Sequence, residues 1–168
     1  MLQIKIQTLS GTEESKSIPT SWRDITWKKY AEYMGMTFDN EIKRLAYFTG
    51  IDEDILLNNA LFLSSMIETC AFIWHPEFLT EYETLVPDYV RKINVSKSDW
   101  GKYESARASI SRHQENVYAS VAEILKMYLD MNVNEQPVTD VIGQATFFLQ
   151  KLQRSPIDSG NYLKPMRT

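Results

Sequence analysis

The sequence has very few of the residues that most enzymes use for catalysis. Its 168 residues include one cysteine and two histidines, His75 and His113, which lie far apart in the chain. The sequence contains no glycine-rich phosphate loop, nucleophile elbow or metal-ligand spacing. We therefore expect a protein that is not an enzyme, binds no metal ion or cofactor, and has no small-molecule substrate.

Two features leave narrow alternatives open. The acidic run Asp52–Asp54 lacks the alternating ligands, the glycine and the distal glutamate of a calcium loop. Because Ile55–Leu57 follow directly, we expect this run to form the first turn of a helix, where carboxylates meet free backbone amides. A pocket that gathered His75 or His113 with two carboxylates would instead indicate an enzyme.

The single cysteine, Cys70, excludes an internal disulfide, and its apolar surroundings predict a buried thiol. No apolar run is long enough to span a bilayer. Residues 1–7 alternate between apolar and polar side chains and lack the continuous apolar core of a signal peptide. We therefore expect a protein that is made in a cytoplasm, remains there and has no membrane partner.

The composition favours a folded protein that contacts other proteins. Hydrophobic residues make up 43% of the chain, which is enough for a core. The net charge of -4 argues against a general nucleic-acid binder, which would show a continuous basic face, so direct nucleic-acid binding is not expected. The 4 tryptophans, 9 tyrosines and 7 phenylalanines indicate that several aromatic side chains lie at a protein interface.

The pattern of residues predicts an α+β fold that is predominantly α-helical, with a helical core and a small β element. We expect one globular domain over residues 1–154, followed by an extended C-terminal arm over 155–168. Within the domain, the pattern predicts a β hairpin over 1–18, helices over 19–84, short strands over 85–96, and a long helix and a last helix over 98–153.

The β element is expected from two parts of the chain. Leu2, Ile4 and Ile6 alternate with polar residues, and residues 14–18 can return as a second strand of the hairpin. The segment 85–95 is rich in β-favouring residues and is interrupted by a proline. Its strands need partners, so they pair either with the N-terminal strand or with another subunit.

Several helices have clear start and stop signals. Thr26 can cap a helix that ends at Gly35, and Asp39 or Asn40 can cap the next one, which ends at Gly50. Further on, the pattern predicts the longest helix from Ser98 or Asp99 to about Met131 without a break. Thr139 can then cap a last helix that ends at about Gln153.

The arm over 155–168 contains two prolines and one glycine. These residues interrupt regular secondary structure, so the short arm cannot form a hydrophobic core of its own. It also has more apolar residues than a purely solvated tail needs. We expect it to dock along a neighbouring chain, with Tyr162 and Leu163 as anchors and with Lys164 and Arg167 paired to an acidic surface. The alternative is a disordered C-terminal end that binds no partner.

Each of the four tryptophans begins or ends a predicted helix. One interpretation is core packing, with the indole N–H at the rim of the core. The other is that the rings anchor a partner protein. On the second interpretation, Trp22, Trp27 and Trp100 are the candidate partner-binding residues, together with the four named residues of the arm.

Three blocks of the sequence resemble small proteins of tailed bacteriophages, including crAss-like podoviruses. The first is Ile18-Pro19-Thr20-Ser21-Trp22-Arg23-Asp24-Ile25-Thr26, followed by Tyr30. The others are Leu45-Ala46-Tyr47-Phe48-Thr49-Gly50-Ile51 and Ser98-Asp99-Trp100-Gly101-Lys102-Tyr103. The chain departs from the family pattern at Trp27, where an aliphatic residue is usual.

This resemblance implies a protein of the phage neck or tail. The protein would be a ring or adaptor component at the portal–tail connector or in the tail, and its partners would be copies of itself and other neck or tail proteins. It would be made in the bacterial host cytoplasm and reside in the virion. The alternative is a tail assembly chaperone that the virion does not retain. No catalytic residues come with the resemblance.

Overall fold

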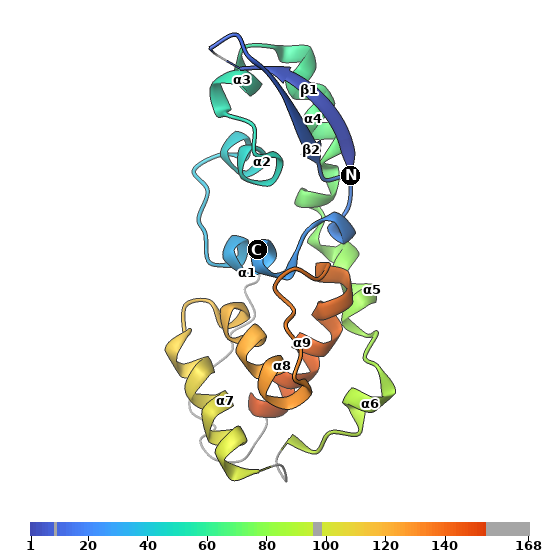
Figure 1. Cartoon of the computed structure of the whole chain (residues 1–168), viewed down its shortest axis with the longest axis vertical. Helices are drawn as coiled ribbons and strands as arrows, with labels where there is room; N and C mark the ends of the chain where they lie inside the picture. The colour runs from blue at the N-terminus through green and yellow to red at the C-terminus, as the bar shows by residue number, and fades with distance from the viewer. Residues whose placement is uncertain (9, 96–98, 154–168) are drawn as a thin grey trace.

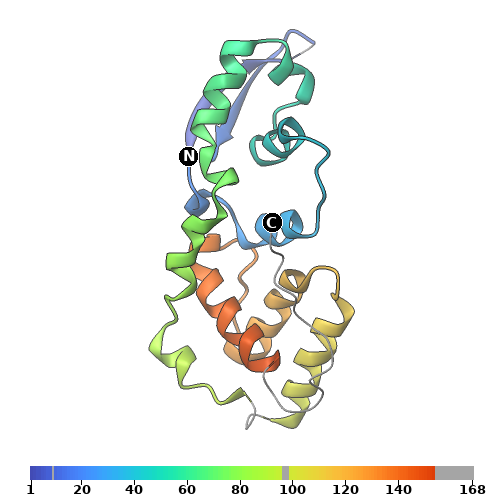
Figure 2. The same cartoon turned by 180° about the vertical axis from the view of Figure 1, so that it is seen from behind.

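A computed structural model describes residues 1–8, 10–95 and 99–153. The molecule is elongated, with the sheet and helices α2 to α4 at one end, α7 to α9 at the other, and α1 between them (Figure 1). Figure 2 shows from behind how α4 leads down one side of the molecule towards α5. Most of the regular structure is helical, and the only sheet among the described residues has two strands. The predicted α+β class with a mainly helical core is therefore confirmed.

The N-terminal hairpin forms as predicted. Strands β1 (Leu2–Gln7) and β2 (Glu13–Ile18) are antiparallel, with Ile4 opposite Lys16. Gly11 has a φ of 82° in the connecting turn, a value that glycine adopts without strain. Ile6 and Ile18 are buried on one face, whereas the side chains of the other face are polar and exposed.

Local caps place the next two helices. α1 (Trp27–Met34) begins after Thr26, whose side chain accepts a hydrogen bond from the amide of Lys29. α2 (Glu41–Thr49) begins after Asn40, whose side chain accepts from the amide of Lys43 at 2.8 Å. α2 ends at Gly50, which has a φ of 67°. Both helices therefore begin and end where their cap residues predict.

The remaining elements are mostly short helices. They are the 3₁₀ turn η1 (Trp22–Asp24), α3 (Glu53–Leu57), α4 (Ala60–Thr69), η2 (Ala71–Trp74), η3 (Pro76–Leu79), α5 (Thr80–Glu83), α6 (Asp88–Arg91), α7 (Trp100–Arg112), η5 (Val117–Ser120), α8 (Val121–Leu129) and α9 (Val138–Gln153). The last helix begins one residue before the predicted cap, and its inward face is buried at Ile142, Ala145, Leu149 and Leu152.

The prediction of strands within 85–95 is wrong. The described residues there contain no strand: Asp88–Arg91 form the single helical turn α6, and Val95 has the 3₁₀ conformation. Pro87 lies just before that turn, where its missing N–H costs no helical hydrogen bond. Val90 and Val95 are fully buried. Their branched side chains favour burial, and burial does not require a strand.

The predicted unbroken helix from 98 to 131 is also wrong. α7 ends at Arg112, and the chain turns through residues 113–116 before η5 and α8. The side chain of Asn116 reaches α1, where its Nδ2 donates to the carbonyl of Ala31 at 2.6 Å. The chain therefore turns where a side chain from this segment contacts a helix that is distant in sequence.

Glu123 joins the two helices that flank this turn. Its Oε2 accepts from the Ser109 hydroxyl at 2.6 Å and from the Arg112 guanidinium at 2.7 Å. The pKa of Glu123 lies below its usual value because Ser109 donates to the carboxylate, although partial burial opposes the shift, and Arg112 and His113 add favourable charge. The ionised carboxylate therefore holds α7 and α8 together.

Replacing Glu123 with glutamine is expected to lower the free energy of unfolding by about 1 kcal/mol at neutral pH. Folding lowers the pKa of this carboxyl from 4.5, its value in the unfolded chain. Such a group stabilises the fold fully above the unfolded pKa, and the stabilisation is lost as the pH falls through the pKa of the folded state. The difference between the two proteins should therefore shrink below pH 4.5. Urea unfolding at several pH values measures it.

The control for this experiment is Glu115→Gln, which removes the same charge from an exposed residue in the turn. It should change the free energy of unfolding by less than about 0.5 kcal/mol at either pH. An equal loss in both variants would show that net charge matters and that the contacts of Glu123 do not.

Main-chain hydrogen bonds connect the two halves of the molecule. The amide of Trp27 donates to the carbonyl of Gln136 at 2.8 Å, and the amide of Val138 donates to the carbonyl of Ile25 at 2.8 Å. The amide of Lys28 also donates to the carbonyl of Asn134 at 3.0 Å. These bonds satisfy two first-turn amides of α1 and the first amide of α9, none of which has a partner within its own helix.

Candidate interaction surfaces

Two of the predicted partner anchors lie in the core. Trp22 is 3% exposed and Trp27 is 1% exposed. The ring of Trp22 packs edge-on against Phe72 at 5.1 Å and Tyr30 at 5.7 Å, and its indole N–H points to the carbonyl of His75 at 3.5 Å. The prediction that Trp22 and Trp27 bind a partner is therefore wrong, and both rings pack in the core. The Nε1 of Trp27 is not at the rim, as expected, but is buried without a hydrogen-bond partner among the described residues.

Trp100 differs from these two, because 62% of its surface is exposed. It is the first residue of α7, and its ring lies 5.7 Å from that of Tyr103, which is buried. Its prediction as a contact residue therefore remains open to test. The arm residues Tyr162, Leu163, Lys164 and Arg167 lie outside the described residues.

The sequence analysis missed an apolar surface at the other end of the molecule. Most side chains of α4 are apolar, yet Met66 is its only fully buried residue. Leu61 is 85% exposed, and Leu57 and Ile67 are also exposed. We call these three residues the upper set. A signal was present in the sequence, because Leu61 falls on the same face of α4 as the polar residues Ser64, Ser65 and Glu68.

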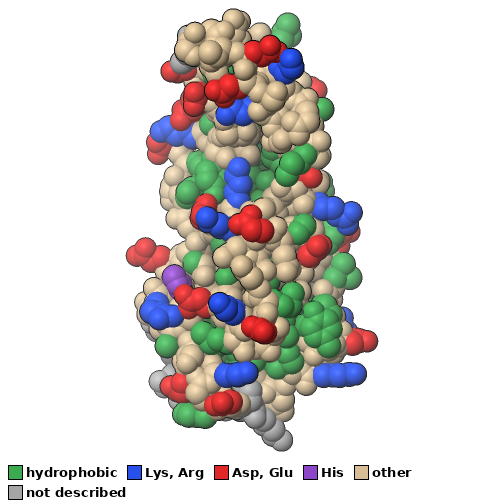
Figure 3. Space-filling model, in the orientation of Figure 1, with side chains coloured by type: hydrophobic (Ala, Val, Ile, Leu, Met, Phe, Trp, Pro, Cys, Tyr) green, Lys and Arg blue, Asp and Glu red, His purple; other side chains and the backbone are tan. Residues whose placement is uncertain are grey.

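A second group of exposed apolar side chains, the lower set, consists of Leu85, Tyr89 and Trp100. These residues come from the α5–α6 connection, α6 and the start of α7, at the opposite end of the molecule from α3 and the start of α4 (Figure 1). Figure 3 shows hydrophobic side chains gathered over the lower part of one face. Large exposed side chains of this kind are typical of protein interfaces.

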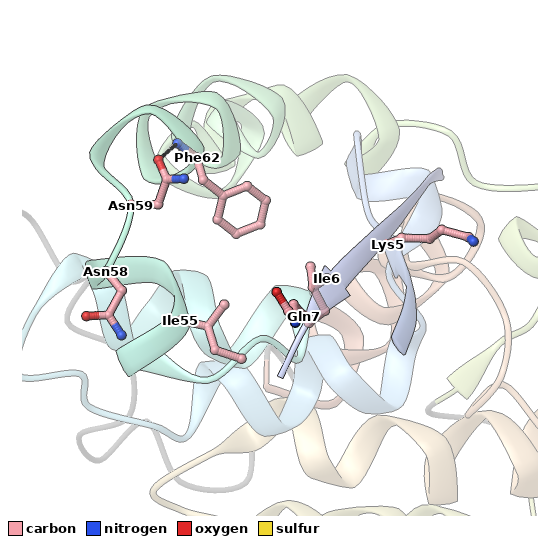
Figure 4. A pocket seen from close by; sticks show the side chains of 7 residues that line it. All are labelled: Lys5, Ile6, Gln7, Ile55, Asn58, Asn59 and Phe62. Atoms are coloured by element: carbon pink, nitrogen blue, oxygen red, sulfur yellow. Dashed lines mark hydrogen bonds between the residues drawn. The ribbon is translucent and has the colours of Figure 1, made fainter. Parts of the chain in front are cut away.

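A cavity of about 300 Å³ lies beside the upper set, between β1 and the α3–α4 connection (Figure 4). Ile6, Ile55 and Phe62 give it apolar walls. Asn59 is held in place at its rim, because its side chain accepts a hydrogen bond from the amide of Phe62 at 3.1 Å. The other lining residues are Lys5, Gln7 and Asn58.

The two histidines lie apart, and each is paired with a different carboxylate. His75 meets one carboxylate, Glu77, at 2.7 Å, and this contact lowers the pKa of Glu77. His113 lies 3.9 Å from Glu123. No group of three or more potential metal ligands occurs among the residues that the structure describes. Among the described residues, each histidine has one carboxylate beside it.

Cys70 is fully buried, as predicted. Its Sγ lies 3.5 Å from the carbonyl of Pro19, and burial raises the pKa of the thiol to about 11. The thiolate, which is the nucleophilic form, is therefore scarce at neutral pH.

No helix in the described part of the chain has the length and the apolar content to cross a membrane. No family model, curated protein or solved structure matches the chain.

Proposed function

We propose that this protein is a non-enzymatic structural component of a tailed-bacteriophage virion. It serves as a ring or adaptor protein of the neck, at the portal–tail connector, or of the tail, and it acts through contacts with copies of itself and with other neck or tail proteins. The resemblance of residues 18–30 to small phage proteins supports this proposal. The observation that carries it is the separation of the upper set from the lower set.

A ring requires two different surfaces on each subunit. In a head-to-tail ring, one surface of a subunit contacts a different surface of the next, whereas a two-fold dimer uses the same surface twice. The upper and lower sets lie at opposite ends of this elongated molecule and come from different elements. Two such surfaces favour head-to-tail assembly, and neither carries groups with an evident catalytic role.

Mass spectrometry of purified virions tests this proposal directly. A ring component should be present in several copies per particle after extensive washing. An assembly chaperone, the alternative function, should be abundant in infected cells and missing from the particle. A protein that is missing from the particle and binds no tail protein in the cell would contradict both functions.

Replacing Leu61 with glutamine is expected to weaken self-association about tenfold, because it removes the most exposed apolar side chain of the upper set. The change should leave the free energy of unfolding within about 0.5 kcal/mol, since the side chain is 85% exposed. Sedimentation velocity over a range of concentrations measures the association. Ser64→Gln, at an exposed position one helical turn further along α4, is the control. Equal association of all three proteins would exclude α4 from the interface.

A further inference from the structure

The outer edge of β1 has free main-chain groups. The amide of Thr8 donates to the carbonyl of Thr12 at 2.8 Å, so these two residues form a hydrogen-bonded pair across the hairpin. Such pairs alternate along antiparallel strands, so Ile6 bonds to β2, whereas Lys5 and Gln7 turn their N–H and C=O groups away from it. Within the described residues, no group hydrogen-bonds the main chain of Lys5 or Gln7. β1 therefore offers an edge to which another strand can pair.

The same edge borders the apolar cavity. Lys5, Ile6 and Gln7 line it, and no residue of β2 does, so the cavity lies on the outer side of β1. Figure 4 shows Ile6 and Ile55 on one side of this space and Phe62 on the other. A strand edge beside a side-chain pocket suits an added strand, because the main chain supplies affinity and the pocket selects side chains.

We propose that this groove binds the C-terminal arm of a second copy of the chain, which adds residues 157–164 as a third strand along β1. The inference rests on the proposed self-assembly and names the segment that mediates it. Residues 157–164 form the longest stretch of the arm without a proline, between Pro156 and Pro165. Proline cannot donate to a strand ladder, so the two prolines would bound the added strand. Its eight residues are enough to pair with the six of β1.

The charges of the arm match those beside the groove. Lys164 and Arg167 are basic. Asp52, Glu53 and Asp54 precede or begin α3, the helix that also supplies Ile55 to the cavity wall. Docking of Tyr162 and Leu163 in the apolar groove would therefore bring the basic residues near an acidic surface, and complementary charge of this kind guides association.

The reach of the arm favours a second copy over the chain's own groove. α9 ends at Gln153 in the lower half of the molecule, whereas β1 and α3 lie at the upper end, with α1 between (Figure 1). Only residues 154–156 separate α9 from the proposed strand, and three extended residues span about 10 Å. A neighbouring subunit can place its groove within that reach.

Disulfide cross-linking between full-length chains tests the docking. Asn58→Cys places a thiol at the groove, and Asn161→Cys places one in the arm while keeping Tyr162 and Leu163. Cys70 is buried, so it should not compete. Mixing the two variants under mild oxidation should give a covalent dimer at least about tenfold faster than mixing Asn161→Cys with Gln150→Cys, a control on the exposed face of α9.

Two results would overturn the proposal. One is cross-linking of the Asn58→Cys and Asn161→Cys mixture no faster than the control. The other is that a chain carrying both cysteines forms only an intramolecular disulfide. That result would show that the groove binds the arm of the same chain. The virion measurement is independent of this test. If the protein is detected in virions and either cross-linking result is obtained, the proposed function is supported and the proposed docking of the arm is excluded.

Proline substitutions test the strand edge separately. Lys5→Pro removes an outward N–H from β1, and Ser15→Pro removes one from the opposite edge of the same hairpin, since Lys5 and Ser15 face each other in a pair without hydrogen bonds. Lys5→Pro should weaken self-association about tenfold, whereas Ser15→Pro and Lys5→Thr should change it less than about twofold. Melting temperatures check that each variant folds, and an equal loss for both prolines would exclude β1 as the specific edge.

Discussion

Replacing Trp22 with alanine is expected to lower the free energy of unfolding by about 3–5 kcal/mol, the usual cost of removing a large buried aromatic side chain. The ring of Trp22 contacts three other rings edge-on, those of Tyr30, Phe48 and Phe72, at centroid distances of 5.7, 6.0 and 5.1 Å. These three rings come from three separate elements, α1, α2 and η2, so the space left by the indole cannot close by the movement of one helix. Equilibrium unfolding in urea measures the loss.

The matched variant is Trp100→Ala, because Trp100 is exposed at the start of α7. It should change the free energy of unfolding by less than about 0.5 kcal/mol. If Trp100 contacts a partner, the same variant should weaken assembly. If both changes destabilise the protein to a similar extent, the assignment of Trp22 to the core and of Trp100 to the surface is contradicted.

Replacing Gly143 with alanine is expected to cost about 2–3 kcal/mol of unfolding free energy. The added Cβ would lie 2.6 Å from the carbonyl oxygen of Leu85 and 2.7 Å from that of Tyr82. Both obstacles are main-chain atoms at the end of α5, so the contact is relieved only if α5 and α9 move apart. This cost exceeds the gain of about 1 kcal/mol that alanine brings to a helix interior. Thermal and urea unfolding both measure the change.

Gly101→Ala is the control, since Gly101 also lies in a helix. Its added Cβ would meet only the side chain of Asp99, at 3.2 Å, and that side chain can move. The variant should be within about 1 kcal/mol of the original protein. A Gly143→Ala protein as stable as the Gly101→Ala protein would show that α5 is not held tightly against α9.

The elements that the sequence predicts correctly depend on neighbouring residues. Thr26 and Asn40 cap the helices that follow them because each accepts a hydrogen bond from an amide three residues ahead. Gly50 ends α2 in a conformation that glycine adopts easily. The alternation of residues 2–7 likewise places one face of β1 against the helices. Each signal lies within a few residues of its effect, so one sequence is enough to identify it.

The wrong predictions concern features that distant contacts decide. Val90 favours a strand by composition, but it is buried in a single helical turn. The chain turns after α7 where Asn116 lies, and the side chain of Asn116 bonds to Ala31, 85 residues away in the chain. No pattern within either segment contains that information.

The candidate surfaces were only partly predictable for the same reason. Trp22, Trp27 and Trp100 occupy similar places at helix ends, and only the folded structure separates the two buried rings from the exposed one. Leu61 lies on the polar face of a mostly apolar helix, which indicates exposure, but the structure alone shows that it is the most exposed side chain of the upper set.

The main-chain hydrogen bonds between α1 and residues 134–138 also constrain when this protein can fold during translation. The carbonyls of Asn134 and Gln136 complete the first turn of a helix that leaves the ribosome more than a hundred residues earlier. Until that late segment emerges, the amides of Trp27 and Lys28 have only water as a partner. A nascent chain can therefore form its hairpin early, whereas the junction between α1 and residues 134–138 can form only after that later segment has been synthesised.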